Sequence, residues 1–228
     1  MNWAIVTGGA DGIGLAIVKE LVRLEYQVVL LDKKELKEKI ENINYFNVDI
    51  NDLVSIEIIL SQYESFDLLV NNAAIQNVKK FMDYTDKEID EVINTNLLSI
   101  MKLTRRVVER MNVGGQVINL GSVHSVLPRK HKLTYDVSKA GLDMFTKGLA
   151  LELAPRIRVN SVNIGATVSP MNSVFEDEVV MEEAKKKVPM DHIFKAEEIA
   201  RVVVSLLSDD FKYMTGSIIV YDGGRSLN

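Results

Sequence analysis

Tyr135 and Lys139 lie four residues apart in a stretch whose apolar residues recur at helical spacing. On a helix, this spacing places the phenol and the ammonium on one face, about one turn apart. A free tyrosine titrates near pH ~10, so it is a weak base at neutral pH unless positive charge stabilises the phenolate. The pair is therefore a candidate acid/base unit. For the two residues alone, a half-buried tyrosine beside a solvated lysine is the simpler explanation.

A glycine-rich turn follows the first predicted strand and leads directly into a segment of helical periodicity. It reads Thr7-Gly8-Gly9-Ala10-Asp11-Gly12-Ile13-Gly14. Glycines allow a tight turn, and the free N–H groups at the start of a helix can bind a pyrophosphate. The spacing Gly-x-x-x-Gly-x-Gly differs from the commoner Gly-x-Gly-x-x-Gly. The turn predicts a dinucleotide phosphate site, with a purely structural strand-to-helix turn as the alternative.

Asp32 stands at the end of the second predicted strand, where a carboxylate can accept hydrogen bonds from an adenosine ribose 2′-OH. The same charge would repel a 2′-phosphate, which favours NAD. Lys33 and Lys34 follow at once and could pair with a phosphate, so NADP is the alternative. Asp49, after the third strand, is placed to meet the adenine or to cap the helix that begins near Asp52.

Polar residues also follow the next two predicted strands. Asn71-Asn72-Ala73-Ala74 places small residues where a cofactor could lie against the backbone. Ser122 ends a later strand, 13 residues before Tyr135, where its hydroxyl could orient a substrate oxygen. Asn96 lies in a predicted long helix among apolar residues, so its amide needs hydrogen-bond partners. The basic loop Arg129-Lys130-His131-Lys132 is most simply solvated, with recognition of an anionic substrate as the alternative.

Short β-rich runs alternate with stretches of helical periodicity along the whole chain. The predicted strands are Trp3–Thr7, Gln27–Leu31, Tyr45–Val48, Phe66–Val70, Gly115–Leu120, Arg158–Ile164 and Ser217–Tyr221. Nearly continuous apolar strands separated by amphipathic helices are typical of a parallel sheet covered on both faces. The sequence therefore predicts an α/β fold: a Rossmann-type doubly wound parallel sheet of about seven strands, with ligands at the carboxyl ends of the strands.

The chain has 228 residues, and no Pro/Gly/Ser-rich linker divides it. We expect one domain over 1–228, with a dinucleotide-binding half to about residue 115 and a catalytic and substrate half beyond it. A net charge of -5 without a basic face disfavours nucleic acid as a partner. The chain has no cysteine, no apolar run long enough to span a membrane, and three histidines without metal-ligand spacing. A soluble cytoplasmic protein without metal is expected.

Taken together, these stretches resemble the short-chain dehydrogenase/reductase family from Trp3 to Gly224. The motifs that carry the resemblance are Thr7 to Gly14, Asp32, Asp49, Asn71 to Ala74, Asn96, Ser122, Tyr135, Lys139, Thr215-Gly216 and Asp222-Gly223-Gly224. Each motif is weak alone, but their order and spacing together make the resemblance specific.

The resemblance implies a role for each catalytic residue. Tyr135 would be the general acid/base on an alcohol or carbonyl, and Ser122 would hold the reacting oxygen. Lys139 would bind the nicotinamide ribose and lower the pKa of the tyrosine, while Asn96 would support a water in the proton relay. The implied cofactor is NAD, with NADP as the alternative. The implied cofactor-binding residues are Gly8, Asp11, Gly12, Ile13, Gly14, Asp32, Asp49, Asn72, Ala73, Tyr135, Lys139 and Ser169.

The chain departs from the family pattern in three places. Ala74 stands where glycine is usual, and Ile164 stands where proline is expected before Gly165. Ser169 takes the place of the threonine that normally meets the nicotinamide carboxamide. The segment 170–189, a mobile substrate lid in this family, is short and acidic here.

Within the family, the chain is similar to bacterial glucose 1-dehydrogenases in Ser122-Val123-His124 with Pro128, in Gly165-Ala166 and in Pro189-Met190. This similarity implies an aldose or another polyol as the substrate. A 3-oxoacyl thioester reductase is the second hypothesis, although such enzymes generally use NADPH. A dinucleotide-binding protein without turnover is the third. The family also implies a homotetramer, assembled through the helices that carry Asn96 and Tyr135 and through the C-terminus.

Overall fold

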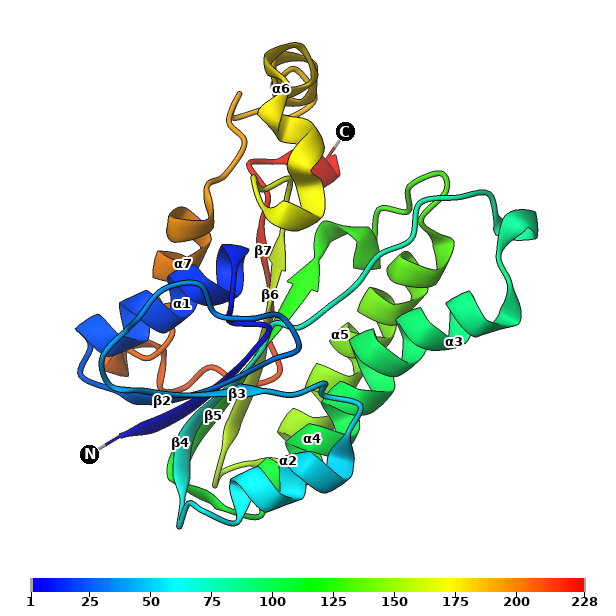
Figure 1. Ribbon diagram of the computed structural model, residues 1–228. Helices are drawn as coiled ribbons and strands as arrows, with labels where there is room; N and C mark the ends of the chain where they lie inside the picture. Colours follow the sequence, from blue (N-terminus) through cyan, green and yellow to red (C-terminus); the bar gives the residue numbers. More distant parts are fainter. Residues whose placement is uncertain (1, 228) are drawn as a thin grey trace.

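The computed structural model describes residues 2–227, and within them seven strands form one sheet in the order β3-β2-β1-β4-β5-β6-β7 (Figure 1). All neighbouring strands are parallel. The strands are β1 (Trp3–Thr7), β2 (Gln27–Asp32), β3 (Ile43–Asn47), β4 (Phe66–Asn71), β5 (Met111–Ser122), β6 (Arg158–Ile164) and β7 (Ile218–Tyr221). The predicted doubly wound fold is confirmed.

The central strands are buried on both faces. In β1, Ala4, Ile5 and Val6 have no exposed surface, and β2 and β4 show the same pattern. Side chains alternate between the faces, so a strand covered on both sides must be apolar at nearly every position. This is why these segments are continuous apolar runs in the sequence.

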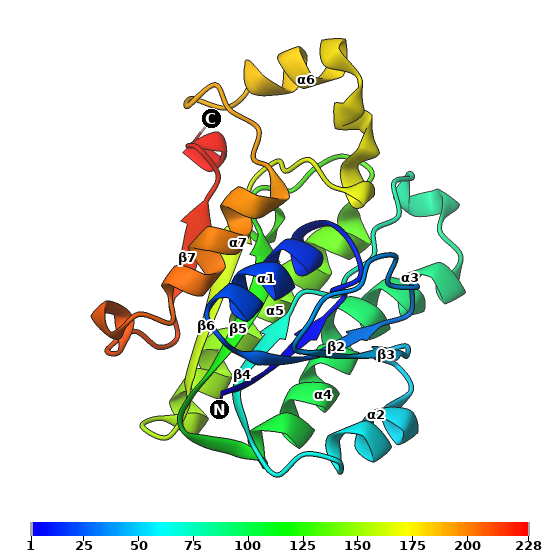
Figure 2. The same ribbon diagram turned by 60° about the vertical axis from the view of Figure 1, so that its left-hand side comes forward.

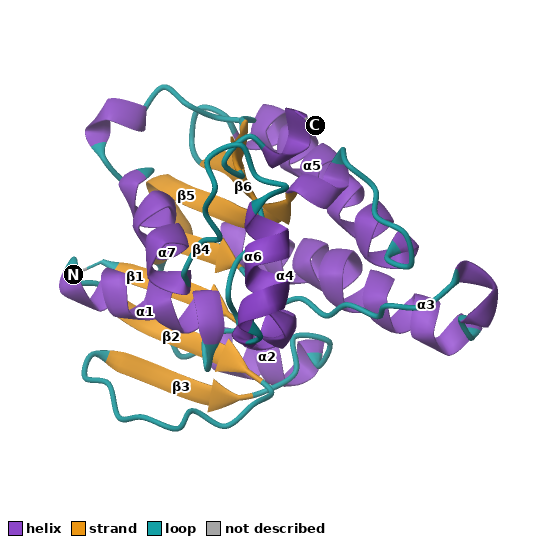
Figure 3. Ribbon diagram, turned by 90° about the horizontal axis from the view of Figure 1, so that it is seen from above, coloured by secondary structure: helices purple, strands orange, loops and turns teal. Residues whose placement is uncertain are grey.

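Helices cover both faces of the sheet (Figures 2 and 3). One face carries α1 (Gly12–Arg23) and α7 (Ala196–Ser205), which pack on each other and on one buried apolar cluster. The other face carries α2 (Leu53–Leu60), α4 (Ser99–Val108) and α5 (Leu133–Leu153) over a second cluster. The sheet therefore separates two cores, and both must form for the central strands to be buried.

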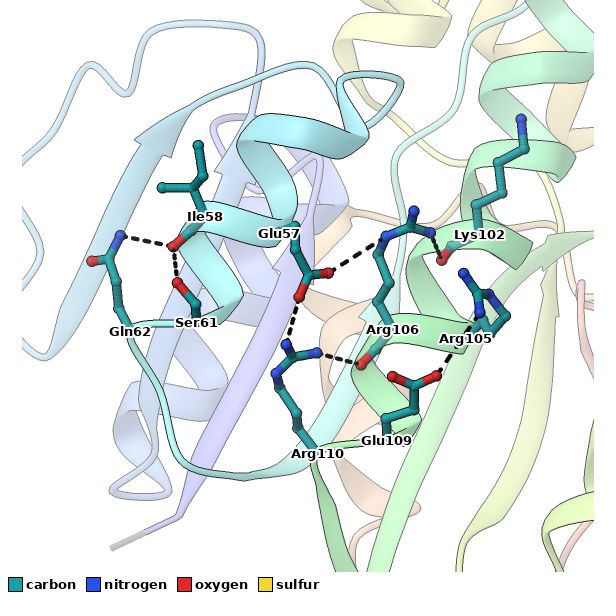
Figure 4. A network of polar contacts seen from close by, with 9 residues as sticks. All are labelled: Glu57, Ile58, Ser61, Gln62, Lys102, Arg105, Arg106, Glu109 and Arg110. Atoms are coloured by element: carbon teal, nitrogen blue, oxygen red, sulfur yellow. Dashed lines mark hydrogen bonds and ion pairs between the residues drawn. The ribbon is translucent and has the colours of Figure 1, made fainter.

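A polar network ties α2 to α4 (Figure 4). Glu57 of α2 accepts a hydrogen bond from Arg110, and its other oxygen lies 3.6 Å from Arg106 Nε. Arg110 in turn donates to the backbone oxygen of Arg106. Because Glu57 is nearly half exposed, such contacts contribute at most about 1 kcal/mol each, and they mainly fix the relative position of the two helices.

The predicted long helix around Asn96 is divided. It consists of α3 (Asp86–Ile93), a π-helical turn (Asn94–Leu98) and α4. Thr85 and Glu88 form a capping box at the start of α3, which fixes where this helical stretch begins. A π-turn widens the helix by one residue per turn, and such turns are frequent at functional sites.

The chemistry-bearing segments meet at the carboxyl edge of the sheet. The glycine-rich turn follows β1, Asp32 ends β2, Asn71 ends β4 and Ser122 ends β5. Above this edge stands α6 (Glu178–Lys185), near the carboxyl ends of β6 and β7 (Figure 1). No helix within residues 2–227 is both long and apolar enough to span a bilayer.

Candidate active site

A cavity of about 1330 Å³ opens at the carboxyl edge of the sheet. Its walls are the glycine-rich turn, the ends of β2, β4 and β5, the loop 123–132 and the segment 169–188. Nearly all the predicted site residues line it: Gly8, Asp11, Gly12, Ile13, Gly14, Asp32, Asp49, Asn72, Ala73, Ser122, Tyr135, Lys139 and Ser169. Asn96 is the predicted residue that does not.

The glycine-rich turn leaves no room for side chains. Gly8 and Gly12 have φ values of +65° and +54°, which favour glycine. A Cβ at Gly14 would lie 2.0 Å from the Gly8 backbone oxygen. Asp11 occupies the N-cap of α1 without a side-chain capping hydrogen bond. The first N–H groups of α1 therefore have no cap from this residue and fit a phosphate.

Asp32 is buried, and both of its oxygens accept backbone hydrogen bonds. Oδ2 accepts from Ala10 N at 2.9 Å and Oδ1 from Lys34 N at 2.8 Å. The Lys34 ammonium turns to Asp11, 2.7 Å away. One of the two lysines that weakened the prediction of NAD is thus already paired with a carboxylate.

The side chains of Asn72 and Asp49 both form hydrogen bonds with nearby backbone atoms. The Asn72 amide donates to Thr7 O and Gly8 O, at 3.0 and 2.8 Å, and so fixes the glycine-rich turn to the end of β4. Asp49 Oδ1 accepts from the backbone and side chain of Asn51. The cap of α2 is Asp52, whose side chain accepts from Ser55 N.

Tyr135 and Lys139 lie side by side in the first half of α5, and both are buried. The Lys139 ammonium is 5.7 Å from the centre of the Tyr135 ring and donates to Leu120 O at 2.7 Å. Burial raises the pKa of Tyr135 to about 12, against a smaller lowering by the hydrogen bond with Ser122. Burial also lowers the pKa of Lys139 to about 8.

The expected lowering of the tyrosine pKa by Lys139 is therefore wrong for the protein by itself. Desolvation of the phenolate outweighs the nearby hydrogen bond, and the carboxylate of Asp136 raises the pKa further. The neutral phenol is the stable form of Tyr135 in this environment. Such a phenol is a proton donor, and additional positive charge in the cavity is needed before it can act as a base.

Asn96 is fully buried in the π-turn, and its amide is engaged on both sides. Oδ1 accepts from Ile75 N at 2.8 Å, while Nδ2 donates to Ile75 O at 2.8 Å and to Ser138 Oγ at 3.1 Å. Its side chain thus ties the segment after β4 to α5. The expected support of a water by Asn96 remains a prediction.

A buried polar cluster lies behind Lys139. Asp143, one turn further along α5, accepts from Asn163 Nδ2 at 2.8 Å, and the same amide donates to Ser125 Oγ at 2.8 Å. A Cβ at Gly121 would lie 1.7 Å from Asn163 Oδ1, so the asparagine fills the space beside this glycine. The negative charge of Asp143 raises the pKa of Lys139 against the lowering by burial.

Three residues of the site were not predicted individually: Gln76, His124 and Lys132. Arg129, Lys130 and His131 are exposed as expected, but Lys132 is buried and its ammonium donates to Gln76 Oε1 at 2.7 Å. The spacing of three residues between Lys132 and Tyr135 was the available signal, because it places both on one helical face. The contact with Gln76, 56 residues away, had no sequence signal.

The predicted lid folds over the cavity. It contains a 3-10 segment (Pro170–Glu176) and α6, and Ser169 precedes it. Met171 at the start of the lid contacts Gln76, a residue that lines the cavity. Gln76 Nε2 donates to Met171 O at 2.9 Å. A Cβ at Gly12 would lie 3.1 Å from Pro170, so the lid also begins against the glycine-rich turn.

Together, these features fit a nicotinamide dinucleotide. The uncapped start of α1 suits its pyrophosphate, Asp32 suits an adenosine ribose, and Tyr135 with Lys139 stands at the far end of the same cavity.

Known proteins match the chain over nearly its whole length. The family model described as "Enoyl-(Acyl carrier protein) reductase" matches residues 8–226. Carbonyl reductase [NADPH] 2 of Sus scrofa is 33% identical over 231 residues, covering 97% of this chain and 95% of that protein. A 3-oxoacyl-[acyl-carrier-protein] reductase of Staphylococcus aureus is 33% identical over 238 residues, covering 97% and 96%.

A solved structure agrees with these matches. The ligand-free aldohexose dehydrogenase of Thermoplasma acidophilum superposes with a TM-score of 0.93 at 27% identity, covering 100% of this chain and 94% of that chain. The predicted resemblance is thus confirmed by sequence and by fold. The chain belongs to the short-chain dehydrogenase/reductase family and is an NAD(P)-dependent oxidoreductase acting on CH–OH and carbonyl groups.

Proposed function

We propose that this protein is an NAD-dependent dehydrogenase in which Tyr135 is the general acid/base, Ser122 holds the reacting oxygen and Lys139 binds the nicotinamide ribose. The observation that supports this assignment is the position of Tyr135, Lys139 and Ser122, all buried and all lining one cavity that begins at the glycine-rich turn. Asn96, whose amide donates to Ser138 of α5, is assigned to the support of the proton relay.

In this proposal, Tyr135 transfers the proton to and from the substrate oxygen. During reduction, the neutral phenol of Tyr135 donates its proton to the carbonyl oxygen that Ser122 holds. During oxidation, Tyr135 takes up the hydroxyl proton as tyrosinate, stabilised by the ammonium of Lys139. The bound nicotinamide supplies or accepts the hydride, and its oxidised ring adds the positive charge that a phenolate needs.

NAD is the preferred cofactor in this proposal. The buried Asp32 carboxylate can accept from a ribose 2′-OH and would repel a 2′-phosphate. Lys34, the neighbouring cation, is paired with Asp11, which reduces its availability for such a phosphate. The cofactor contacts are assigned to the predicted set that lines the cavity, with Ser169 at the carboxamide.

Two substrate classes compete. An aldose is supported by the motifs around Ser122 and Gly165 and by the similarity in fold to an aldohexose dehydrogenase. A 3-oxoacyl thioester is supported by the 33% identical carrier-protein reductase. The absence of cysteine supports a cytoplasmic location, and the family resemblance supports a homotetramer.

The test is the appearance of reduced nicotinamide absorbance when purified protein is mixed with NAD or NADP and a panel of aldoses, polyols and hydroxyacyl thioesters. We expect Tyr135→Phe to lower the rate by about 100-fold or more while NADH binding, measured by nucleotide fluorescence, is nearly retained. A Tyr135→Phe protein with the original rate would remove tyrosine from the mechanism. Cofactor binding without turnover of any alcohol would instead favour the silent dinucleotide-binding protein.

A further inference from the structure

The carboxylates that line the cavity gather at one of its ends. The end near the glycine-rich turn carries Asp11, Asp32 and Asp49, together with Lys33 and Lys34. Among the described residues, the half bounded by the loop 123–132 and the lid has a single lining carboxylate, Glu183, which pairs with Lys186. The cationic side chains in that half are Arg129, Lys130, Lys132, Lys139, Lys187 and Arg225.

Lys132 differs from the other cations of this half, apart from Lys139, because it is buried, with 7% of its surface exposed. Its ammonium lies 6.0 Å from the centre of the Tyr135 ring and donates to Gln76 Oε1. Gln76 is held in turn by its own donation to Met171 O. The ammonium therefore has a fixed position at the reacting end of the cavity.

The ammonium of Lys132 has no direct counter-ion. No carboxylate oxygen within residues 2–227 lies within the 4.0 Å that defines an ion pair with it. Its charged neighbours are Arg129 and Asp136, and Asp136 Oδ2 already accepts from Arg129 N at 2.9 Å. Burial lowers the pKa of Lys132 and the charge of Arg129 lowers it further, against a smaller raising by Asp136. A buried cation is costly unless it is paired.

Lys132 also stands at a position where a lysine does not stabilise the helix. It is the N-cap of α5, where small polar residues such as serine or aspartate are preferred because they accept from the helix N–H groups. The positive end of the helix dipole adds to the ammonium there. Stability of the helix thus gives no reason for a lysine, whereas binding of an anion does.

We propose that the substrate is a small hydroxy acid, or the corresponding oxo acid, whose carboxylate binds the ammonium of Lys132. The inference rests on the proposed function, because it places the carbinol oxygen at Tyr135 and Ser122. Since Lys132 lies so close to the Tyr135 ring, the carboxylate must be only a few bonds from the reacting carbon. Gln76 orients the ammonium and connects this contact to the start of the lid.

A neutral sugar does not provide this complement. Its hydroxyls could hydrogen-bond to Lys132 but would leave the buried charge uncompensated. A carboxylate accepts the same hydrogen bond and also carries the opposite charge, so it neutralises the buried ammonium, which a hydroxyl does not do. The structure therefore favours an acid over an aldose of similar size as the substrate of this same site.

The test compares each acid with its own methyl ester, which has the same carbon chain but no charge. The panel contains racemic 2-hydroxybutyrate, 3-hydroxybutyrate and 4-hydroxypentanoate, their methyl esters, and glucose as a neutral sugar, each with NAD. We expect at least one acid to have a kcat/KM about 10- to 100-fold above that of its ester. Lys132→Met should abolish this ratio, and Lys132→Arg should retain most of it.

Lys80→Met is the matched control. Lys80 lies four residues after Gln76, but its side chain is exposed and does not line the cavity. It should keep the acid-to-ester ratio. Esters that react as well as acids, a ratio that survives in Lys132→Met, or turnover of glucose alone would overturn the inference and leave the proposed function standing. Silence with every alcohol would overturn both.

Discussion

Asp143 lies outside the cavity lining, but its charge acts on Lys139, which lines the cavity. It is one helical turn beyond Lys139, and its carboxylate raises the pKa of that ammonium. Lys139 must stay protonated to stabilise a tyrosinate, and its pKa of about 8 lies close to the pH at which dehydrogenases are assayed. The buried carboxylate thus extends the pH range over which Lys139 is charged.

We predict that Asp143→Asn moves the alkaline limb of the kcat profile to lower pH. Removing the negative charge removes a contribution that raises the pKa of Lys139, so the ammonium is lost earlier as the pH rises. Asparagine still accepts from Asn163, which preserves the hydrogen bond. The measurement is the pH dependence of kcat, with Asp90→Asn on the exposed surface of α3 as the control. An unshifted limb would contradict this role.

Asp32 is expected to determine the choice between NAD and NADP. In Asp32→Ala, the hydrogen bonds to the ribose and the repulsion of a 2′-phosphate are both lost, so NAD affinity should fall by about 10- to 100-fold and the preference should move toward NADP. Dissociation constants for the two nucleotides test this. Since Ala10 N and Lys34 N also lose their acceptor, Asp32→Asn serves as a second variant that keeps one. An unchanged ratio would exclude the ribose contact.

The site residues that could be predicted from the sequence are those that belong to local motifs. Tyr135 with Lys139, the glycine-rich turn and Asp32 are each recognisable because their spacing follows from one helix, one turn or one strand end. Lys132 was interpreted as part of a solvated loop, since its burial depends on Gln76, which is distant in the chain. Without a cofactor ring, the pKa of Tyr135 is raised instead of lowered, because desolvation depends on the complete surroundings of a side chain.

At the scale of elements, the glycine-rich turn joins β1 to α1 with almost no free space. Gly14→Ala would place a Cβ 2.0 Å from Gly8 O and 2.5 Å from Asn72 Nδ2. We predict loss of NAD binding and a decrease of about 1–3 kcal/mol or more in the free energy of unfolding. Titration with NADH and chemical denaturation measure the two effects.

Gly148 provides the matched comparison for Gly14. It is exposed within α5, and no atom lies within 4 Å of the Cβ that alanine would add. Gly148→Ala should therefore raise the free energy of unfolding by about 0.5–1 kcal/mol, because alanine restricts the unfolded chain and favours the helix. Equal effects at the two positions would contradict the steric account of the turn.

The strands were predictable because each is a short apolar run bounded by turn residues. Their limits shift by a few residues: β3 begins at Ile43 instead of Tyr45, and β5 begins at Met111 instead of Gly115. The π-turn at Asn94–Leu98 was not predictable, since its residues keep a helical pattern. Within the turn, Asn96 makes two hydrogen bonds to Ile75, a contact between distant segments that has no local sequence pattern.

At the scale of the whole molecule, α5 exposes a row of apolar side chains. Val137, Met144 and Leu151 recur every seven residues, which places them along one side of the helix, and they are 53%, 67% and 84% exposed. The proposed homotetramer would cover this row, because its assembly uses the helix that carries Tyr135.

We predict that Met144→Glu reduces the assembly to smaller species. A carboxylate in a buried apolar contact would be desolvated without a partner. Light scattering during size-exclusion chromatography measures the mass, and Lys37→Glu, an exposed change between β2 and β3 and away from α5, is the control. A tetramer that survives Met144→Glu, or a monomeric parent protein, would contradict the use of this face.

The close contact between Asn163 and Gly121 also restricts which substitutions evolution can accept at these two positions. Any side chain at position 121 would overlap the Asn163 amide, while a smaller residue at position 163 would first leave Asp143 and Ser125 without their shared donor. Each single step therefore passes through a less stable protein. We expect the two positions to be inherited as a pair, changing together in descendants of this gene or staying as they are.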